Sequence, residues 1–271
     1  MIKGKRIIVT GGAGSIGSEL VRQLYKNNRI FVIDINETGI FEIMNELGVY
    51  GRIGDIRDRS VIEDVFSDFK PQIVIHSAAL KHVTPNELYP EEAIKTNILG
   101  TLNLIQEAKN WECLEKFVFI STDKAVQSNS IMGATKRCAE IMVKNQGKGF
   151  VAVRFGNVLG SRGSVIPIWQ KQIESGKITV TDEKAKRYMM TIEDACGLVI
   201  KAAEEGEGGE IFVLNMGEQI NILDLAKRII KGNEIDIEIT GLRKGETLEE
   251  KLMFEEEEKR AVKNNNYWII K

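Results

Sequence analysis

A short apolar run followed by three evenly spaced glycines limits the fold of this chain more than any other feature. Residues 6–17 read RIIVTGGAGSIG, with glycines at positions 11, 14 and 17. Glycine permits a tight turn and lets backbone N–H groups come close to a ligand. The pattern predicts a strand at Arg6–Thr10, a tight turn, and a helix over Gly17–Asn27. The N-terminus of such a helix favours a bound pyrophosphate.

An acidic residue at the end of the next predicted strand extends this pattern. Asp34 follows Gly17 by 17 residues, and together they form the context of a dinucleotide-binding fingerprint. A carboxylate here accepts hydrogen bonds from both ribose hydroxyls and repels a 2′-phosphate. No arginine follows in the run DINE. The sequence therefore favours NAD over NADP as the cofactor.

The first half of the chain alternates short apolar runs with amphipathic stretches. Strands that alternate with helices predict a parallel sheet covered on both faces, so the fold class is α/β, a Rossmann-type doubly wound sheet. The predicted strands are Arg6–Thr10, Ile30–Asp34, Gly48–Gly51, Ile73–His76, Lys116–Ser121 and Phe150–Phe155. The predicted helices are Gly17–Asn27, Glu37–Leu47, Ser60–Phe69, Pro90–Lys109 and Ser130–Gln146.

The rhythm changes after residue 155, where the predicted elements become short. We expect residues 1–155 to form the nucleotide-binding domain, with residues 192–220 returning to it, and residues 156–271 to form a small C-terminal α/β substrate-binding lobe. The acidic run Glu255–Glu258 is interpreted as a solvated helix face. The remaining predictions are helices in Ser161–Ser175, Ile192–Glu205 and Ile222–Lys231, and strands at Ile178–Val180, Glu210–Asn215 and Ile235–Thr240.

Composition narrows the classes of partner. The chain has 271 residues, 43% hydrophobic and 28% charged, with a net charge of −2. No broad basic field is available for nucleic acid or an anionic membrane. No apolar run approaches the ~20 residues that span a bilayer. The three scattered cysteines are typical of a reduced, cytoplasmic protein, and neither they nor the two histidines form a metal-ligand pattern.

A polar cluster follows the fifth predicted strand. Thr122, Asp123 and Lys124 lie just past that strand, at the edge where open α/β sheets bind ligands. Further along, Met132 and Lys136 are spaced i, i+4 on a predicted helix, so they share one face. Lys136 can hydrogen-bond a nicotinamide ribose, and its charge lowers the pKa of a neighbouring acid.

The motifs together resemble the extended short-chain dehydrogenase/reductases. The match rests on TGGAGSIG, HSAALKHV, KTNILGT, STDKAV, MGATKR and RFGNVLGSRGSVIP. Within that superfamily the pattern STDKA followed by MGATKR is similar to the CapD-like branch of UDP-N-acetylglucosamine 4,6-dehydratases. The resemblance covers roughly residues 5–250. It implies this cofactor-binding set: Gly11, Gly14, Ser15, Ile16, Gly17, Asp34, Asn36, Asp55, Ile56, Ala78, Ala79, Lys81, Asn97 and Lys136.

The resemblance also implies a reaction. Hydride leaves C4 of the sugar, a base removes the C5 proton, an acid protonates the departing C6 hydroxyl, and hydride returns to C6. Asp123 is expected as the acid and Lys124 as the base, and Thr122 is expected to bind the C4 oxygen. Such acid–base groups typically contribute 10²–10⁴-fold. The implied catalytic set is Thr122, Asp123, Lys124, Met132 and Lys136.

Met132 stands where most members of the superfamily have the tyrosine that deprotonates the C4 hydroxyl. A thioether cannot accept that proton. By resemblance, some dehydratases of this branch also carry methionine here. Asp123, or a water held by Lys136, is a candidate replacement base, and filling a gap in the core is the alternative role for Met132.

The resemblance further implies a pocket for the nucleotide sugar. Arginines suit a diphosphate because their donors match two oxygens at once. Gly163 belongs to the same loop as several members of the set. The implied substrate-binding residues are Lys81, His82, Asn157, Arg162, Ser164, Val165, Arg187, Arg243 and Glu246. His76 is expected to have a hydrogen-bonding role within the fold.

Two departures from the family pattern stand out. The run QSNS replaces a proline-containing turn between Asp123 and Met132. By the same resemblance, we expect a free-standing catalytic domain without the membrane-spanning N-terminal region of the larger relatives. The leading hypothesis is an NAD-dependent 4,6-dehydratase. The alternatives are a nucleotide-sugar 4-epimerase and a catalytically impaired binder. A homo-oligomer formed through the helices at Pro90–Lys109 and Ser130–Gln146 is expected.

Overall fold

A nine-stranded sheet organises the molecule. The computed structural model describes residues 2–232 and 234–271. The strand order is β14-β15-β11-β6-β5-β4-β1-β2-β3, and the seven strands from β3 to β11 are parallel. This is the predicted Rossmann-type α/β fold. The strands are β1 Arg6–Thr10, β2 Arg29–Asp34, β3 Tyr50–Ile53, β4 Ile73–His76, β5 Lys116–Ile120, β6 Phe150–Arg154, β11 Ile211–Leu214, β14 Val262–Asn264 and β15 Tyr267–Ile270.

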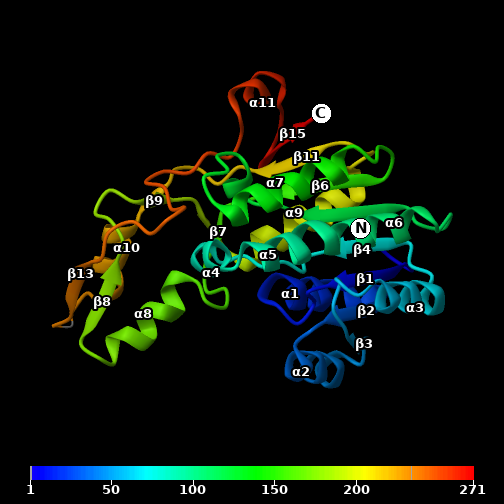
Figure 1. Ribbon diagram of the computed structural model, residues 1–271, viewed down its shortest axis with the longest axis horizontal. Coiled ribbons are helices and arrows are strands. Elements are labelled where there is room, and N and C mark those ends of the chain that lie inside the picture. Colours follow the sequence, from blue (N-terminus) through cyan, green and yellow to red (C-terminus); the bar gives the residue numbers. More distant parts are fainter. Residues whose placement is uncertain (1, 233) are drawn as a thin grey trace.

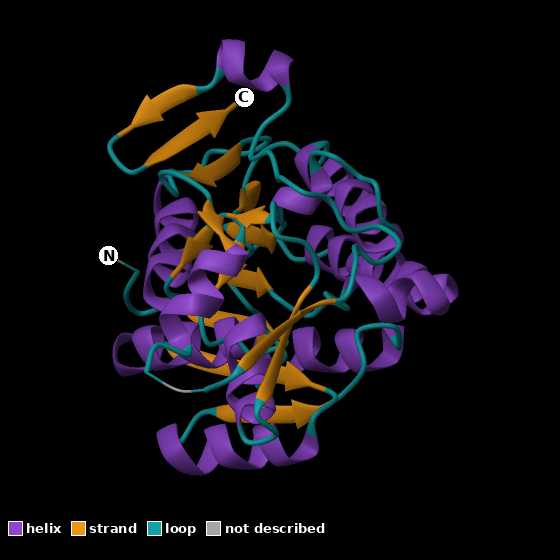
Figure 2. Ribbon diagram, turned by 90° about the vertical axis from the view of Figure 1, so that its left-hand side faces the viewer, coloured by secondary structure: helices purple, strands orange, loops and turns teal. Residues whose placement is uncertain are grey.

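Helices cover both faces of this sheet (Figures 1 and 2). Alternate residues of a strand point to opposite faces, so Ile7 and Val9 enter one core while Ile8 enters the other. The first core contains side chains of α1 (Ser15–Leu24), α2 (Glu37–Leu47) and α9 (Ile192–Glu205). The second contains side chains of α3 (Arg59–Phe69), α6 (Thr101–Lys109) and α7 (Ile131–Lys144). Burial on both faces explains why these strands are almost entirely apolar.

The predicted elements of the first half are present, but several differ in their bounds. The third strand begins at Tyr50 instead of residue 48, because Gly48 ends α2 in the left-handed conformation at φ 65°. The helix predicted over Pro90–Lys109 is divided into α5 (Pro90–Ala93), a π-helical segment η2 (Ile94–Gly100) and α6. The short helices here are η1 Tyr25–Asn27, α4 Val83–Leu88 and η3 Asp123–Ala125.

After residue 156 the chain forms the lobe, and two later segments return to the large sheet. Strand β11, within residues 192–220, pairs with β6 in parallel. The hairpin β14–β15 also joins this sheet, antiparallel to β11, although the predicted division placed it in the C-terminal lobe. Without this hairpin, β11 would be an edge strand of the sheet.

The lobe is a separate, smaller layer on the left of Figure 1. Its core gathers around the buried Trp169, Ile178 and Val180. Parallel strands β8 and β13 form its larger ribbon, which confirms the strand expected at Ile235–Thr240. The remaining elements are β7 Asn157–Val158, α8 Val165–Ile173, β8 Lys177–Val180, β9 Lys186–Arg187, β10 Met189–Met190, β12 Ile220–Asn221, α10 Ile222–Ile229 and β13 Asp236–Ile239.

The acidic run near the C-terminus is not wholly a solvated helix face. It forms α11 (Glu255–Arg260), in which Glu257 is buried while its acidic neighbours are exposed. Glu257 lies 2.7 Å from Arg154 of β6, and Glu140 of α7 lies 2.6 Å from the same guanidinium. Arg154 is fully buried and pairs with both carboxylates, so the prediction for this run was wrong at Glu257.

The described residues were also searched for membrane helices and metal ligands. Within residues 2–232 and 234–271, no helix has the length and apolar character to cross a membrane. The same ranges hold no cluster of three or more His, Cys, Asp or Glu side chains suited to a metal ion. Cys113, Cys138 and Cys196 are free thiols.

Candidate active site

Two glycines that flank the turn between β1 and α1 occupy positions with no room for a side chain. A Cβ on Gly11 would lie 2.6 Å from the Ala78 nitrogen, and one on Gly17 would lie 2.2 Å from the Gly11 oxygen. Gly11 also has φ 67°, where L side chains are strained. Because these glycines have no side chain, β1, α1 and the end of β4 can approach one another closely. The turn therefore leaves an open cradle of backbone beside the sheet edge.

The N-terminus of α1 faces this cradle without a capping side chain. Its N-cap is Gly14, so the first backbone N–H groups remain available to an anion. Asp34 is held on the other side, since its carboxylate accepts from the Ala13 nitrogen at 3.0 Å and the Asn36 nitrogen at 2.9 Å. Asn36 itself caps α2 through Gly39. The uncapped helix and the oriented carboxylate fit a dinucleotide, and Asp34 fits a ribose diol.

The other predicted cofactor residues surround the same edge. Asp55 forms an ion pair with Arg57 at 2.6 Å. Ile56 is buried against Gly100. Asn97 uses its amide within the protein, accepting from the Leu80 nitrogen at 2.8 Å and donating to the Leu80 oxygen at 3.0 Å. Asn97 therefore positions the loop that carries Ala78, Ala79 and Lys81.

A loop from the second half closes over this edge. The Arg162 nitrogen donates to the Ser15 hydroxyl at 3.0 Å, next to the half-buried Ile16. Lys81 Nζ donates to the Arg162 oxygen at 2.8 Å. A Cβ on Gly163 would lie 2.7 Å from the His82 ring. These contacts join the glycine turn, the loop after β4 and the start of the lobe.

Helix α7 presents Met132 and Lys136 one turn apart, both buried. Lys136 Nζ donates to the Ile120 oxygen and lies 4.0 Å from the centre of the Phe119 ring. Burial lowers the pKa of Lys136 to about 7, although Glu140 opposes this shift. The amine of Lys136 can therefore gain or lose a proton near neutral pH.

His76 has the role within the fold that the sequence predicts. Its ring lies between the hydroxyls of Thr10 at 2.8 Å and Thr101 at 2.9 Å. Burial, with a smaller contribution from the Lys136 charge, lowers the pKa of His76 to about 3. His76 is therefore neutral and links β1, β4 and α6.

Hydrogen bonds and an ion pair join the polar residues that follow β5. Asp123 Oδ1 accepts from the Thr122 hydroxyl at 2.9 Å and the Lys124 backbone nitrogen at 2.8 Å, and Lys124 Nζ lies 3.1 Å away. Asp123 is 1% exposed. Burial raises its pKa, but the Lys124 charge and the hydrogen bonds outweigh burial and lower the pKa overall. Burial also lowers the pKa of Lys124, but the negative charges of Asp123 and Glu250 outweigh burial and raise the pKa overall.

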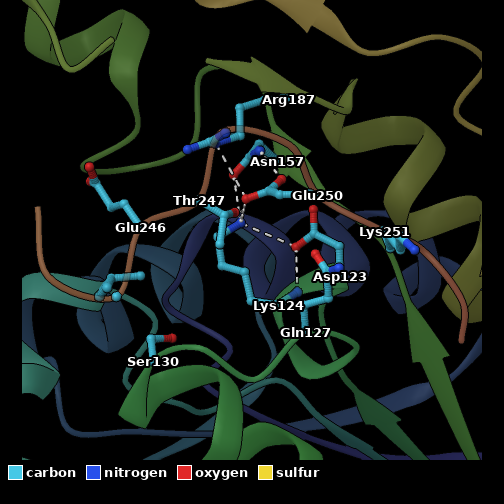
Figure 3. A pocket seen from close by; sticks show the side chains of 12 residues that line it. Asp123, Lys124, Gln127, Ser130, Asn157, Arg187, Glu246, Thr247, Glu250 and Lys251 are labelled. Carbon is cyan, nitrogen blue, oxygen red and sulfur yellow. Dashed lines mark hydrogen bonds and ion pairs between the residues drawn. The ribbon is translucent and has the colours of Figure 1, made fainter. Parts of the chain in front are cut away.

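A second carboxyl group, which sequence reasoning missed, completes the cluster. Glu250 Oε1 lies 2.7 Å from Lys124 Nζ and 3.3 Å from Arg187 Nε. The Asn157 amide donates to Glu250 Oε2 at 3.2 Å. Figure 3 shows Lys124 between the two carboxyl groups. Burial is the largest cause that raises the pKa of Glu250 to about 7, against the opposing charge of Lys124.

Two cavities lie at this junction between sheet and lobe. The first, of about 180 Å³, is lined by Asp123, Lys124, Asn157, Arg187 and Glu250 among others. The second, of about 270 Å³, extends into the lobe. Arg187, Asn157 and Glu246 line both cavities. The structure thus gathers around the second cavity six of the predicted substrate residues: Asn157, Ser164, Val165, Arg187, Arg243 and Glu246.

Other predicted residues do not line either cavity. Lys81 instead donates to the Arg162 oxygen, and the His82 ring lies beside Gly163 of the closing loop. Met132 and Lys136 are buried side chains of α7. Gln127, Ser130 and Thr247 line the first cavity and were not predicted. No local pattern distinguishes Glu250 within GETLEEKL, because its partners are distant in the chain.

A family model and individual relatives both match most of this chain. The model of the family described as polysaccharide biosynthesis protein matches residues 7–271. Capsular polysaccharide biosynthesis protein CapD of Staphylococcus aureus is 48% identical over 270 residues, which are 92% of this chain and 45% of that protein. The chain thus spans less than half of that relative.

A shorter relative and a solved structure are similar over most of their length. The inverting UDP-N-acetylglucosamine 4,6-dehydratase of Campylobacter jejuni is 34% identical over 285 residues, covering 100% of this chain and 84% of that protein. The structure of Thermus thermophilus UDP-glucose 4-epimerase in complex with NAD has a TM-score of 0.80 and 27% identity, covering 90% of this chain and 88% of that one.

Proposed function

The chain belongs to the polysaccharide biosynthesis protein family, and from this membership we propose that it is an NAD-dependent nucleotide-sugar 4,6-dehydratase. The proposed substrate is a UDP-N-acetylhexosamine, most simply UDP-N-acetylglucosamine. The product is a UDP-4-keto-6-deoxy sugar for surface polysaccharide or modified-sugar synthesis. The 34% identical Campylobacter jejuni relative bears the name of such an enzyme.

The Asp123–Lys124 pair, in which Asp123 is buried and Lys124 half-buried, is the observation that carries this proposal. Removing water from a hexose requires a base at C5 and an acid at C6. Asp123 and Lys124 lie 3.1 Å apart at the carboxyl end of β5 and line the polar cavity. Epimerisation at C4 needs no such pair. Groups of this kind typically contribute 10²–10⁴-fold to a rate.

The cofactor proposal rests on the glycine cradle and Asp34. The uncapped start of α1 would bind the pyrophosphate, and Asp34 would bind the adenosine ribose. Bound NAD would accept a hydride from C4 of the sugar and return it to C6. Lys136, buried in α7, would bind the nicotinamide ribose.

Met132 requires another group to take the C4 hydroxyl proton, because its thioether is not a base. We propose Asp123, since its carboxylate has a lowered pKa and lies in the cavity where Lys124 stabilises the negative charge. Met132 is 2% exposed and would serve as an apolar wall. A water held by Lys136 is the alternative base.

The lobe supplies the proposed site for the nucleotide. The second cavity has apolar walls that include Val180 and Ile222, with Arg187 and Arg243 on its lining. Apolar walls with a few placed charges are typical of small-molecule sites. The two arginines would bind the diphosphate, and Ser164, Val165 and Glu246 would contact the uridine.

The structural likeness to a UDP-glucose 4-epimerase supports an alternative function. In that alternative the chain would invert C4 without loss of water. It is less favoured because C4 epimerisation does not require the Asp123–Lys124 pair. A third possibility is an impaired binder, for which Met132 is the reason.

Proton NMR tests the three functions together. The protein is incubated with UDP-N-acetylglucosamine in deuterated water, with and without added NAD. We expect a new C6 methyl signal and deuterium at C5. The Lys124→Ala variant should reduce this rate by about 10²-fold or more.

Other outcomes separate the alternatives. A C4 epimer without a methyl signal would replace the proposal with the epimerase. Binding of the nucleotide sugar in saturation-transfer spectra, without any new product, would support the impaired binder.

A further inference from the structure

One oxygen of the Asp123 carboxyl is buried without a hydrogen-bond donor. Among the described residues, no N–H or O–H group donates to Asp123 Oδ2. All three donors to this side chain reach Oδ1 instead. Buried acceptors are almost always hydrogen-bonded, so this oxygen calls for an explanation. Gly156 lies beside it, since a Cβ there would come within 2.9 Å.

Glu250 is the neighbouring group that can supply the missing hydrogen. Its carboxyl interacts with that of Asp123, and in Figure 3 the two groups face each other. Two ionised carboxylates this close repel each other, whereas one shared proton gives a hydrogen bond. Lys124 binds both groups, at 3.1 Å and 2.7 Å.

We propose that Glu250 is a positioning residue that shares one proton with Asp123 and so keeps Asp123 able to act as the acid of the reaction. This inference rests on the proposed dehydratase function for its chemical role. The proton sharing itself rests only on the buried Asp123 oxygen, the adjacent Glu250 carboxyl and the lysine between them.

The charges around Glu250 support movement of that proton. When Asp123 takes the proton, the negative charge stays on Glu250. Lys124 Nζ and Arg187 Nε stabilise it there, and the Asn157 amide donates to it. The other charged residues that line this cavity are Glu246 and Lys251. The raised pKa of Glu250, about 7, agrees with a proton held near neutrality.

The proton count balances over one turnover. The sugar loses its C4 hydroxyl proton to the carboxyl pair. The pair then gives one proton to the C6 oxygen, which leaves as water when the C5–H and C6–O bonds break. As the pair protonates the C6 oxygen it accepts a proton from the Lys124 ammonium, and the neutral amine takes the C5 proton. Lys124 then delivers one of its exchangeable protons to C5 as hydride reaches C6, and the pair returns a proton to the amine. The pair ends the cycle with the same number of protons.

The Glu250→Gln variant tests this proposal. A glutamine keeps the shape and can donate to Asp123 Oδ2, but it cannot transfer a proton. Glu249→Gln is the matched control, because Glu249 is the adjacent residue, is exposed and pairs with Lys186 instead. Glu250→Asp keeps the proton and shortens the side chain.

The first measurement is independent of turnover. Difference infrared spectra between pH 6 and pH 8 should show the carbonyl band of a protonated carboxyl group in the wild type and in Glu249→Gln. The band should be lost in Glu250→Gln. If the wild type shows no such band, or if Glu250→Gln keeps it, the proton sharing is refuted whatever the enzyme does.

The second measurement follows the reaction. In Glu250→Gln we expect methyl formation to fall about 10²-fold or more, and the decline of rate above neutral pH to disappear. Binding of UDP-N-acetylglucosamine should stay within a few-fold, and Glu250→Asp should restore part of the rate with the wild-type pH profile. An unchanged rate, or equal losses in binding and rate without a change in pH profile, would refute the role. If the wild type makes no methyl product while the infrared band follows Glu250, the dehydratase function fails and the proton sharing stands.

Discussion

Lys136 illustrates how one buried residue links chemistry to stability. Its amine is buried under β5 against the Phe119 ring, and its charge has no carboxylate in direct contact among the described residues. Burial disfavours the charged form, which lowers the pKa from 10.5 to about 7. In the unfolded chain the same amine keeps a proton up to the ordinary lysine pKa. Folding and protonation are therefore coupled at this residue.

The pH dependence of stability follows from this coupling. Between pH 7 and pH 10.5 the unfolded state binds more protons at Lys136 than the native state, so this residue makes the free energy of unfolding rise with pH. Below pH 7 both states are charged and the destabilising effect is complete. The Lys136→Met variant should lose this rise, which amounts to at most about 1.4 kcal/mol per pH unit.

Urea unfolding of the wild type and variant across that pH window measures the effect. Only the slope of the difference matters, since methionine also removes a hydrogen bond to Ile120. The control is Lys109→Met, at the exposed end of α6. Its stability should follow the wild-type pH dependence. Equal pH dependence in wild type and Lys136→Met would contradict the prediction.

The site residues that the sequence analysis proposed share one property: each lies in a recognisable local sequence pattern. The glycines, Asp34 and the Asp123–Lys124 pair are each recognisable because the flanking strand and helix patterns place them at the sheet edge. Glu250 could not be found this way. Its partner Asn157 is 93 positions away, and its raised pKa arises from burial that only the folded chain creates.

At the scale of elements, α7 connects the proposed site to the C-terminus. The helix carries Met132 and Lys136 near its start and Glu140 one turn later. Glu140 binds Arg154 of β6, which also binds Glu257 of α11. The Phe254 nitrogen donates to Glu257 as well, at 3.0 Å. Short α11 is thus anchored by a buried ion pair under the helix that holds the proposed catalytic residues.

Removing one charge of this network should destabilise the protein. In Glu257→Gln, Arg154 keeps Glu140 but loses one charged hydrogen-bond partner, so we expect a loss of about 1.5–3 kcal/mol. Complete loss of its partners would cost about 3–5 kcal/mol. Glu258→Gln, an exposed position in the same helix, should change stability by less than about 0.5 kcal/mol.

Denaturant unfolding of both variants measures the difference. A Glu257→Gln protein as stable as Glu258→Gln would show that the ion pair adds nothing to the fold. The sequence could not predict which glutamate of the run EEEE is buried, because that choice depends on an arginine 103 positions earlier.

Element order was predictable for the parallel strands, since each strand and helix has its own periodicity. The strands of the hairpin β14–β15 were not predicted, and their residues fell within the range expected for the lobe, because a short strand contains no information about which sheet it joins. The π-helical segment η2 was also missed. Its hydrogen-bond pattern differs from that of an α-helix, but its side-chain pattern does not.

At the scale of the whole molecule, the proposed site lies between the sheet and the lobe. The cofactor cradle comes from the sheet, the second cavity comes largely from the lobe, and the Asp123–Lys124–Glu250 cluster joins them. Glu250 is further tied to the lobe side through Gln219, which donates to its backbone oxygen at 3.0 Å. The segment that carries Glu250 therefore contacts both the lobe side and the acid–base cluster.

The outer faces of η2 and α7 give the last prediction, on assembly. Helix α7 packs against η2, and both expose large apolar side chains: Leu99 is 47% exposed and Ile141 is 43% exposed. Apolar side chains that gather on adjacent exposed helices favour contact with another copy of the chain. We propose that these helices form the interface of a homo-oligomer.

A charge placed in such an interface would be desolvated without a partner. The double variant Leu99→Glu, Ile141→Glu should therefore have the mass of a monomer by multi-angle light scattering, while the wild type is larger. The control Phe41→Glu alters an equally apolar residue, 67% exposed on α2, and should keep the wild-type mass. A wild type that is already monomeric, or a double variant of unchanged mass, would contradict an interface through these helices, and in the second case the exposed face of α2 becomes the next surface to test.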